Sequence, residues 1–201
     1  MKRALIFGGG VYGKEFPDFY ADDFVIAADK GCEILRKHGI SPDVSVGDFD
    51  SSSFIPENAV VLPVEKDVTD THAAVDIALR KNCDEIHIYG GMGGRIDHTF
   101  ANYSLVACLA EKGKKAYLYG ENYTVTAVSD GAIRINGKKG KTVSVFSFGE
   151  KSEGVSLNGL CYPLKNAVLS NTFALGVSNS FECEDAEISV KKGTLLIMIE
   201  N

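Results

Sequence analysis

Residues 1–122 alternate short apolar runs with segments of helical period, and this alternation constrains the fold more than any other feature. Strands that alternate with helices are typical of a mostly parallel sheet with right-handed crossover connections. The expected strands are 3–7, 24–28, 44–46, 59–64, 85–89 and 115–119, and the expected helices are 30–38, 71–82 and 98–112. The sequence therefore predicts a Rossmann-like α/β domain over residues 1–122.

Beyond residue 122 the hydrophobic period changes to two, and no helical pattern interrupts the rest of the chain. The expected strands are 124–128, 132–135, 142–148 and 186–190. Turn signals such as Asn136-Gly137 lie between these runs, as they do in antiparallel hairpins. We therefore expect an all-β antiparallel sandwich domain over residues 123–201.

The formal net charge of -6 argues against broad binding to nucleic acids or anionic membranes, which requires basic patches. No apolar run approaches the ~20 residues of a membrane-spanning helix. The apolar stretch in MKRALIFGGG is also too short for a signal peptide. The five cysteines show no C-x-x-C spacing, which indicates reduced thiols. We expect a cytoplasmic protein that binds neither nucleic acid nor membrane.

The segment Gly47-Asp48-Phe49-Asp50-Ser51-Ser52 follows an apolar run and places two carboxylates at the end of a strand. Side chains at i and i+2 of an extended segment point to the same side, so Asp48 and Asp50 are expected to lie together. Two adjacent anions repel each other unless a cation or a proton is bound, and Mg2+ prefers such oxygen ligands. The alternative is that both aspartates form Asx-turns with Ser51 and Ser52.

Other polar residues also follow the ends of expected strands, where open α/β sheets bind their ligands. They are Asp29 after the second strand, Lys66, Asp67, Thr69 and Asp70 after the fourth, and Gly90 to His98, with Arg95 and Asp97, after the fifth. Carboxylates suit a metal, Lys66 and Arg95 suit phosphate oxygens, and glycines let backbone N–H groups approach a ligand. The sequence therefore predicts a phosphate and metal site on this rim of the sheet.

Structural interpretations of the same residues stay open. Asp70 and Asp97 are also plausible N-caps, and Gly90–Gly94 is compatible with a flexible turn. Gly8-x-Gly10-x-x-Gly13 matches a dinucleotide-binding motif only by count, because no clear helix follows it. The same glycines lack the spacing of a P-loop, so we expect no dinucleotide site there.

Five segments stand out when they are taken together. They are Ala28-Asp29-Lys30-Gly31, Gly47-Asp48-Phe49-Asp50-Ser51, Lys66-Asp67-Val68-Thr69-Asp70, Gly90 to His98 with its Gly-Gly-Arg-x-Asp-His core, and Gly176-Val177-Ser178-Asn179-Ser180-Phe181. Several are weak individually, but the combination of GDFDS, KD-x-TD, GGR-x-DH and SN-x-F is highly specific. In content and order the segments resemble the thiamine pyrophosphokinase family, over nearly the whole chain.

The resemblance implies an ATP- and Mg2+-binding catalytic α/β domain, a thiamine-binding β-sandwich, and a homodimer whose active site lies between subunits. The family's reaction transfers the pyrophosphoryl group of ATP to thiamine, which gives thiamine diphosphate and AMP. On this basis Mg2+ is held by Asp48, Asp50, Asp67 and Asp70, and the catalytic set is Asp48, Asp50, Asp70 and Arg95. Substrate contacts are expected from Asp29, Lys66, Thr69, Asp97, Ser178, Asn179 and Phe181.

Two positions depart from the family's pattern. The family commonly has glycine where Lys30 stands, and a lysine there is suited instead to a phosphate. Some members stack thiamine on a tryptophan; this chain has none, so Phe181 or a tyrosine is expected to serve. Two other functions stay open, namely a metal-dependent phosphohydrolase that activates water and a non-catalytic sensor of thiamine or nucleotide.

Overall fold

The computed structural model of this 201-residue chain describes residues 2–13, 16–49, 56, 59–63 and 67–201. The chain divides into two compact units. Unit 1 comprises Met1–Leu105 and Ala116–Glu121, and unit 2 comprises Val106–Lys115 and Asn122–Asn201. The expected domain boundary after residue 122 stays a prediction.

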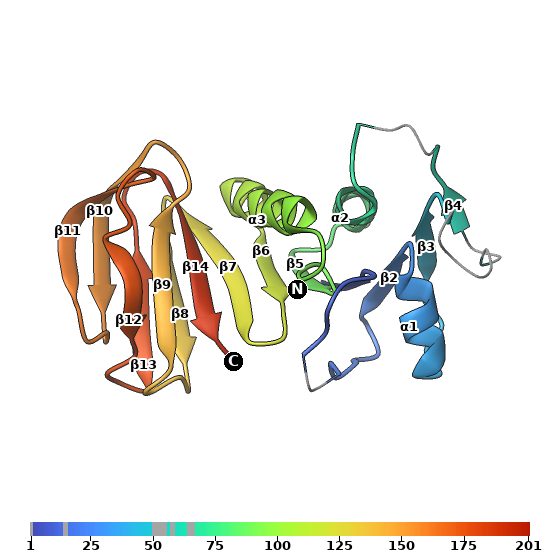
Figure 1. Cartoon of the computed structure of the whole chain (residues 1–201), viewed down its shortest axis with the longest axis horizontal. Coiled ribbons are helices and arrows are strands. Elements are labelled where there is room, and N and C mark those ends of the chain that lie inside the picture. The colour runs from blue at the N-terminus through green and yellow to red at the C-terminus, as the bar shows by residue number, and fades with distance from the viewer. Residues whose placement is uncertain (1, 14–15, 50–55, 57–58, 64–66) are drawn as a thin grey trace. The chain divides into compact units, whose positions relative to one another are not determined.

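Unit 1 contains a sheet with the strand order β6-β5-β1-β2-β3-β4 (Figure 1). The strands are β1 (Arg3–Phe7), β2 (Phe24–Ala28), β3 (Val44–Gly47), β4 (Ala59–Val61), β5 (Glu85–Tyr89) and β6 (Lys115–Tyr119). The helices are α1 (Gly31–Lys37), α2 (Asp70–Arg80) and α3 (Ile96–Glu111), of which the last runs on into unit 2. The pairings of β1 with β2 and β5, and of β3 with β2 and β4, are parallel. The prediction of an α/β fold with parallel strands is confirmed.

The short apolar runs form strands because both of their faces are buried. In β1, Leu5 and Phe7 pack in one hydrophobic cluster together with Leu35 of α1. Ala4 and Ile6 alternate with them along the strand and are fully buried as well. A parallel strand that is covered on both faces reads as a continuous apolar run, which is the pattern that predicted β1.

The starts of two helices differ from the sequence expectation. The N-cap of α2 is Thr69 rather than Asp70, because the Thr69 backbone is extended and its Oγ1 accepts a hydrogen bond from the His72 N–H at 3.2 Å. Helix α3 begins at Ile96, so Asp97 lies in its first turn instead of capping it. No helix in the described part of the chain is long and apolar enough to span a membrane.

Unit 2 contains two groups of strands whose paired neighbours run antiparallel. Their orders are β12-β9-β14-β7 and β11-β10-β13-β8. The strands are β7 (Tyr123–Ser129), β8 (Ala132–Asn136), β9 (Thr142–Ser147), β10 (Lys151–Asn158), β11 (Leu164–Ser170), β12 (Gly176–Ser180), β13 (Asp185–Ser189) and β14 (Thr194–Glu200). The prediction of an antiparallel, sandwich-like second part is confirmed.

Four of these strands, β10, β11, β12 and β14, were not among those expected from the sequence. In the β10–β11 pair the register shifts between Glu153 and Val155 and again between Val155 and Leu157, which breaks the period of two. Strand β12 is short and polar, and it contains a register shift of its own. Strand β14 is apolar with little alternation because most of its residues are buried. Periodicity therefore identified only the regular, half-buried strands.

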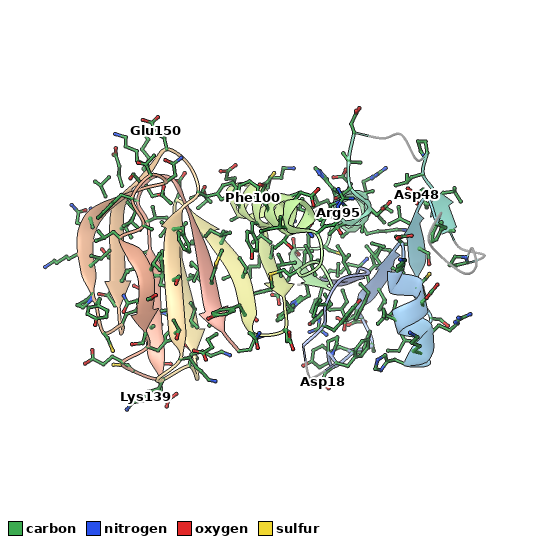
Figure 2. All side chains as sticks on the ribbon, viewed as in Figure 1. Asp18, Asp48, Arg95, Phe100, Lys139 and Glu150 are labelled. Atoms are coloured by element: carbon green, nitrogen blue, oxygen red, sulfur yellow. The ribbon has the colours of Figure 1, made fainter. Side chains whose placement is uncertain are left out.

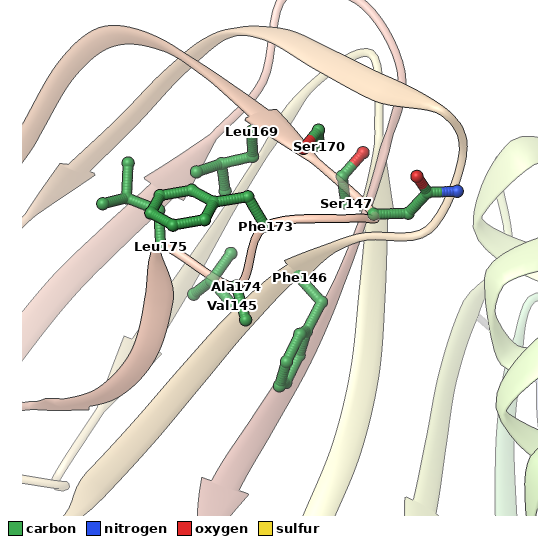
Figure 3. A pocket seen from close by; sticks show the side chains of 9 residues that line it. Val145, Phe146, Ser147, Leu169, Ser170, Phe173, Ala174 and Leu175 are labelled. Atoms are coloured by element: carbon green, nitrogen blue, oxygen red, sulfur yellow. The ribbon is translucent and has the colours of Figure 1, made fainter.

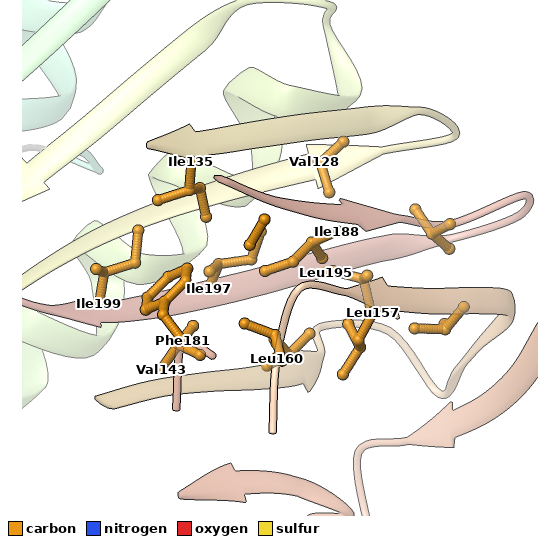
Figure 4. Close-up of a cluster of buried hydrophobic side chains, with 14 of the residues drawn as sticks. Val128, Ile135, Val143, Leu157, Leu160, Phe181, Ile188, Leu195, Ile197 and Ile199 are labelled. Carbon is orange, nitrogen blue, oxygen red and sulfur yellow. The ribbon is translucent and has the colours of Figure 1, made fainter. Parts of the chain in front are cut away.

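The core of unit 2 lies where apolar side chains from several of its strands meet (Figure 4). Phe181 and Leu160 are each 1% exposed and belong to this core, together with Ile197 of β14. The core packs side chains from the inner faces of both strand groups, as in a β-sandwich. Residues that flank Phe181 in the chain are thereby held at fixed positions on the surface.

Candidate active site

The loops that follow β2 and β3 lie against each other in unit 1. Asp29 comes directly after β2, and its backbone N–H donates to the Val46 carbonyl at 2.9 Å. Its φ of +47° is a conformation that residues other than glycine rarely adopt. A Cβ at Gly47 would lie 3.1 Å from the Asp29 Cα, a tight contact that favours glycine just before Asp48. The strained backbone of Asp29 therefore lies where the Asp29 and Asp48 loops come together.

The acidic residues of this rim are only partly described. Asp48 follows β3 and is half-buried, and Figure 2 shows it at the same edge of unit 1 as Arg95, opposite Asp18. Asp67 is exposed, while Asp70 is the first residue of α2 and is half-buried. The expected ligands Asp50 and Lys66 lie outside the described residues. Within the described ranges, no three His, Cys, Asp or Glu side chains form a group that could hold a metal ion.

Arg95 and Asp97 form an exposed ion pair at the start of α3. The Arg95 Nη2 lies 2.6 Å from the Asp97 Oδ2, and the Arg95 Nε donates to the Asp97 Oδ1 at 3.2 Å. The hydrogen bond from Arg95 lowers the pKa of Asp97 to about 2, assisted by the His98 N–H. The two side chains are 70% and 61% exposed, so the guanidinium remains accessible to an anion.

The loop from Gly90 to Gly94 is held in shape by its glycines and by one buried amide. Gly90, Gly93 and Gly94 have φ values of +65°, +81° and +70°, which favour glycine. Asn102 of α3 is 4% exposed, and its Nδ2 donates to the Gly91 carbonyl at 2.7 Å. The loop is therefore anchored to α3 and is not a free turn.

The glycines after β1 have a structural role beside this loop. Gly8 N–H donates to the Tyr89 carbonyl at 2.8 Å, and Gly10 N–H donates to the Gly90 carbonyl at 2.7 Å. A Cβ at Gly10 would lie 2.5 Å from the Gly90 oxygen. Because both N–H groups are bonded to backbone carbonyls, they are not presented to a phosphate. Lys30 is exposed on the next loop.

In unit 2, the three expected thiamine-contacting residues differ sharply in exposure. Ser178 is exposed with a φ of +56°, next to the register shift of β12. Asn179 is 3% exposed, and Phe181 is 1% exposed in the core. The Phe181 ring has no face left for a ligand, so the structure argues against the expected stacking role. Sequence alone gave no sign of this, because strand register decides which residues point inward.

The exposed aromatic residue beside this segment is Tyr162, which is 70% exposed. The Asn179 side chain holds the Tyr162 backbone at both its N–H and its carbonyl. Sequence reasoning allowed for a tyrosine but could not select one among the eight in the chain. Tyr162 thus joins Ser178 as an exposed candidate for contact with a substrate.

A pocket in unit 2 is not a plausible substrate site. Figure 3 shows it at the end of β9, with the Phe173 ring beside Leu169 and Leu175. Its volume is only ≈ 40 Å³, far below the roughly 300–1,000 Å³ of typical ligand pockets. None of the predicted site residues lines it.

Comparison with known proteins accounts for both units. The family "Thiamin pyrophosphokinase, catalytic domain" matches residues 19–118, and "Thiamin pyrophosphokinase, vitamin B1 binding domain" matches residues 132–195. The chain is 32% identical over 214 residues to a thiamine pyrophosphokinase of Bacillus subtilis (strain 168), a match that covers 100% of this chain and 99% of that protein.

Solved structures agree with this relationship. A crystal structure of thiamine pyrophosphokinase from Bacillus subtilis superposes with a TM-score of 0.88 at 28% identity, covering 100% of this chain and 99% of that one. A thiamin pyrophosphokinase from Geobacillus thermodenitrificans gives a TM-score of 0.84 at 26% identity, covering 100% and 98% of the two chains. The chain therefore belongs to the thiamine pyrophosphokinase family.

Proposed function

We propose that this enzyme transfers the pyrophosphoryl group of ATP to the hydroxyl group of thiamine, which gives thiamine diphosphate and AMP. The observation that carries the proposal is that the catalytic and the vitamin B1 binding family domains match the same chain in order. In the reaction the thiamine hydroxyl oxygen bonds to the β-phosphorus, the bond from that phosphorus to the oxygen shared with the α-phosphate breaks, and the hydroxyl proton passes to a base. A carboxylate of the rim is suited to accept that proton.

The carboxylates of the rim fit Mg2+ by their chemistry. Asp48, Asp67 and Asp70 supply hard oxygen donors in unit 1, and Asp50 would complete the set. Mg2+ is usually held by one or two carboxylates, water and substrate phosphates, so a preformed group of three protein ligands is not required. When bound, the ion neutralises charge on the phosphate oxygens.

The cationic and polar residues of the rim are proposed to bind and align the triphosphate. Arg95 is exposed although it is paired with Asp97, and its guanidinium has further donors that suit phosphate oxygens. Thr69 and Lys66 are proposed to contact the nucleotide, and Asp29 shapes the acidic edge. Transfer of this kind depends mainly on alignment and on neutralisation of anionic oxygens. Asp97 is proposed to face thiamine.

Unit 2 is proposed to supply the thiamine contacts. Ser178 is exposed and offers a hydroxyl group, and the Tyr162 ring replaces Phe181 as the aromatic contact. Thiamine carries a cationic thiazolium ring, and a cation over a tyrosine face is attracted by the ring quadrupole. This assignment gives the second half of the chain a role that a phosphohydrolase would not need.

We further propose a homodimer. Strands β11 and β12 stand at the ends of their strand orders, and Val168, Phe173, Leu175 and Val177 on or between them are 57%, 69%, 50% and 42% exposed. Exposed edge strands with apolar side chains are normally covered by a partner. Light scattering after size exclusion is expected to give twice the chain mass. A Phe173→Lys variant that keeps the mass of the unaltered dimer at every concentration would exclude this face as the dimer interface.

In that dimer, the rim of one subunit is proposed to work with the Tyr162 and Ser178 segment of the other. Mixing an Asp48→Asn variant with a Tyr162→Ala variant tests the arrangement, because subunit exchange creates one site that carries neither change. At low thiamine concentration the mixture is expected to exceed the sum of the two separate activities. A mixture that only equals that sum, despite proven exchange, would place each site within one subunit.

Product analysis tests the reaction itself. Purified protein is incubated with ATP, Mg2+ and thiamine, and each component is left out in turn. AMP and thiamine diphosphate are expected together, and only in the complete mixture. Release of phosphate or pyrophosphate without thiamine would support a phosphohydrolase, and binding without AMP would support a sensor. We expect the enzyme to work in the cytoplasm, where ATP is available and exposed thiols such as those of Cys161 and Cys183 stay reduced.

A further inference from the structure

The segment before β11 runs alongside the end of β12 in unit 2. Leu160 and Phe181 form an isolated antiparallel bridge, and both side chains are buried in the core. The Cys161 N–H donates to the Ser180 carbonyl at 2.9 Å. These backbone contacts continue as far as Cys161, and the next residue, Tyr162, is held in a different way.

The Asn179 side chain takes the place of a strand neighbour for Tyr162. Its Nδ2 donates to the Tyr162 carbonyl at 2.8 Å, and its Oδ1 accepts from the Tyr162 N–H at 2.9 Å. The Oδ1 also accepts from the Ser180 N–H at 2.9 Å. A side-chain amide has the same donor and acceptor as a peptide group, so Asn179 extends the ladder by one residue. Only this orientation of the amide satisfies both groups of Tyr162.

These contacts leave Asn179 unsuited to bind a substrate directly. Its side chain is buried, and both its oxygen and its nitrogen are engaged with the backbone. Tyr162 shows the opposite pattern, because its backbone is fixed at two atoms while its ring is 70% exposed. A rigid backbone below an exposed ring reduces the entropy lost when a ligand stacks on that ring.

We propose that Asn179 is a positioning residue, which acts on thiamine through the Tyr162 ring. The proposal rests on the proposed function, in which Tyr162 is the aromatic contact. It assigns Asn179 a different role from the direct contact that the sequence suggested. Fixing the Tyr162 N–H and carbonyl sets the direction in which the ring leaves the backbone, and the ring then meets the flat, cationic part of thiamine.

A double-mutant cycle tests the coupling. The Asn179→Ala, Tyr162→Ala and double variants are compared with the unaltered enzyme for kcat and for the KM of thiamine and of ATP. Each single change is expected to raise the KM of thiamine about tenfold, a loss of about 1.4 kcal/mol, with the KM of ATP nearly unchanged. In the Tyr162→Ala background, Asn179→Ala is expected to raise the KM of thiamine little further, because its effect requires the Tyr162 ring.

Two outcomes would overturn the proposal. If Asn179→Ala raises the KM of thiamine by the same factor in both backgrounds, Asn179 acts independently of Tyr162. If it lowers kcat alone with an unchanged KM, it does not act in thiamine binding. KM does not depend on the fraction of folded enzyme, so a partly unfolded variant remains informative. Failure of the unaltered enzyme to form AMP and thiamine diphosphate would instead refute the proposed function.

A spectroscopic measurement keeps the test independent of activity. The chain contains no tryptophan, so Tyr162→Trp introduces a single tryptophan at the proposed contact, and its fluorescence can be excited separately from that of the tyrosines. Its fluorescence anisotropy is expected to fall when Asn179→Asp is added, because the aspartate places an oxygen opposite the Tyr162 carbonyl and breaks the bond. Asn171→Asp, at an exposed position of the same unit, serves as the matched control. Unchanged anisotropy in the Asn179→Asp protein would overturn the positioning role.

Hydrogen exchange of the unaltered protein covers the case in which no Asn179 variant folds. The Tyr162 N–H is expected to exchange as slowly as the Cys161 N–H, although only a side chain holds it. Exchange of the Tyr162 N–H at the rate of an open loop would mean that Asn179 does not fix this residue, and would overturn the proposal.

Discussion

Asp48 lies at the point where a buried strand becomes a loop, and its half-buried carboxylate is proposed to hold Mg2+ against phosphate oxygens. The Asp48→Asn change keeps the size of the side chain and removes its charge. We expect kcat to fall about 10²–10³-fold, the usual effect of losing one group that stabilises charge in the transition state. Steady-state kinetics at saturating ATP, Mg2+ and thiamine measure this.

Asp22→Asn is a suitable control for that change. Asp22 is exposed and precedes β2, so it lies at the opposite end of the strand from the rim. Its variant is expected to retain full kcat, and circular dichroism should show that both variants are folded. Near-normal turnover by a folded Asp48→Asn protein would remove Asp48 from the proposed metal site.

Ser45 lies in β3, and its buried hydroxyl group is expected to destabilise the folded protein. It is completely buried, and no described residue offers a hydrogen-bond partner to its Oγ. Leaving such a group unsatisfied costs about 1–3 kcal/mol. Ser45→Ala is therefore expected to raise the free energy of unfolding by about 1 kcal/mol, measured by urea denaturation.

Ser152 provides the comparison, because it is equally buried but fully bonded. Its Oγ donates to the Thr194 carbonyl at 3.1 Å and pairs with the Ser147 Oγ at 2.8 Å. Ser152→Ala removes two buried hydrogen bonds, although the Thr194 carbonyl keeps the Phe148 N–H and the Ser147 Oγ keeps the Gly149 carbonyl. The change is expected to lower the free energy of unfolding by about 0.5–1.5 kcal/mol for each bond lost. A Ser45→Ala protein destabilised to the same extent would show that Ser45 has a partner in solution.

Single residues also show where sequence reasoning succeeds. Asp29 and Asp48 were predicted to belong to one rim because they follow strands, and parallel strands end at the same edge of a sheet. Asn179 and Phe181 were predicted from a motif alone, which records residue types but not burial. Whether an asparagine in a β-strand points to ligand or to backbone depends on bulges and register, and those are set by neighbouring strands.

At the scale of elements, strands β5 and β6 share a buried polar group on one face. His87 of β5 is 7% exposed, its Nε2 lies 2.8 Å from the Glu85 Oε1, and its Nδ1 lies 2.8 Å from the Tyr119 hydroxyl. The Tyr117 and Tyr119 rings stack on the imidazole. Burial lowers the pKa of His87, and the hydrogen bond to Glu85 opposes that shift only in part.

This arrangement predicts a loss of stability in mild acid. The unfolded chain takes up a proton on His87 near pH 6.5, whereas the folded protein does so at a lower pH. Between these values the unfolded state binds more protons, so the free energy of unfolding decreases as the pH falls. His87→Gln cannot titrate, and we expect its free energy of unfolding to fall less between pH 7.5 and 5.5. Parallel urea titrations across this range measure the difference.

The comparison isolates His87 because the other histidines, His38, His72 and His98, and all carboxylates are present in both proteins. Arg3 and Asp23 also act electrostatically on His87 and are unchanged in the variant. Identical pH profiles for the two proteins would show that His87 is not held neutral by the fold. The sequence around His87 predicted a strand but not this buried hydrogen-bond group, because the partner of His87, Tyr119, comes from another strand.

At the scale of the whole molecule, the two units are expected to respond differently to the two substrates. ATP with Mg2+ is proposed to bind the loops of unit 1, whereas thiamine is proposed to bind the Tyr162 and Ser178 segments of unit 2. A ligand slows hydrogen exchange where it orders the backbone, and it stabilises the folded state by mass action. Hydrogen exchange followed by mass spectrometry separates these effects along the chain.

We expect ATP with Mg2+ to slow exchange in residues 47–49 and 90–95, and thiamine to slow it in residues 159–162 and 176–180. Strand β13 serves as an internal control, since no site is proposed there and its exchange should not change. Thiamine that protects residues 90–95 without any protection of 159–162 would contradict the assignment of unit 2. Protection of both regions by ATP alone would contradict the assignment of one substrate to each unit, because unit 2 would then respond to the nucleotide as well.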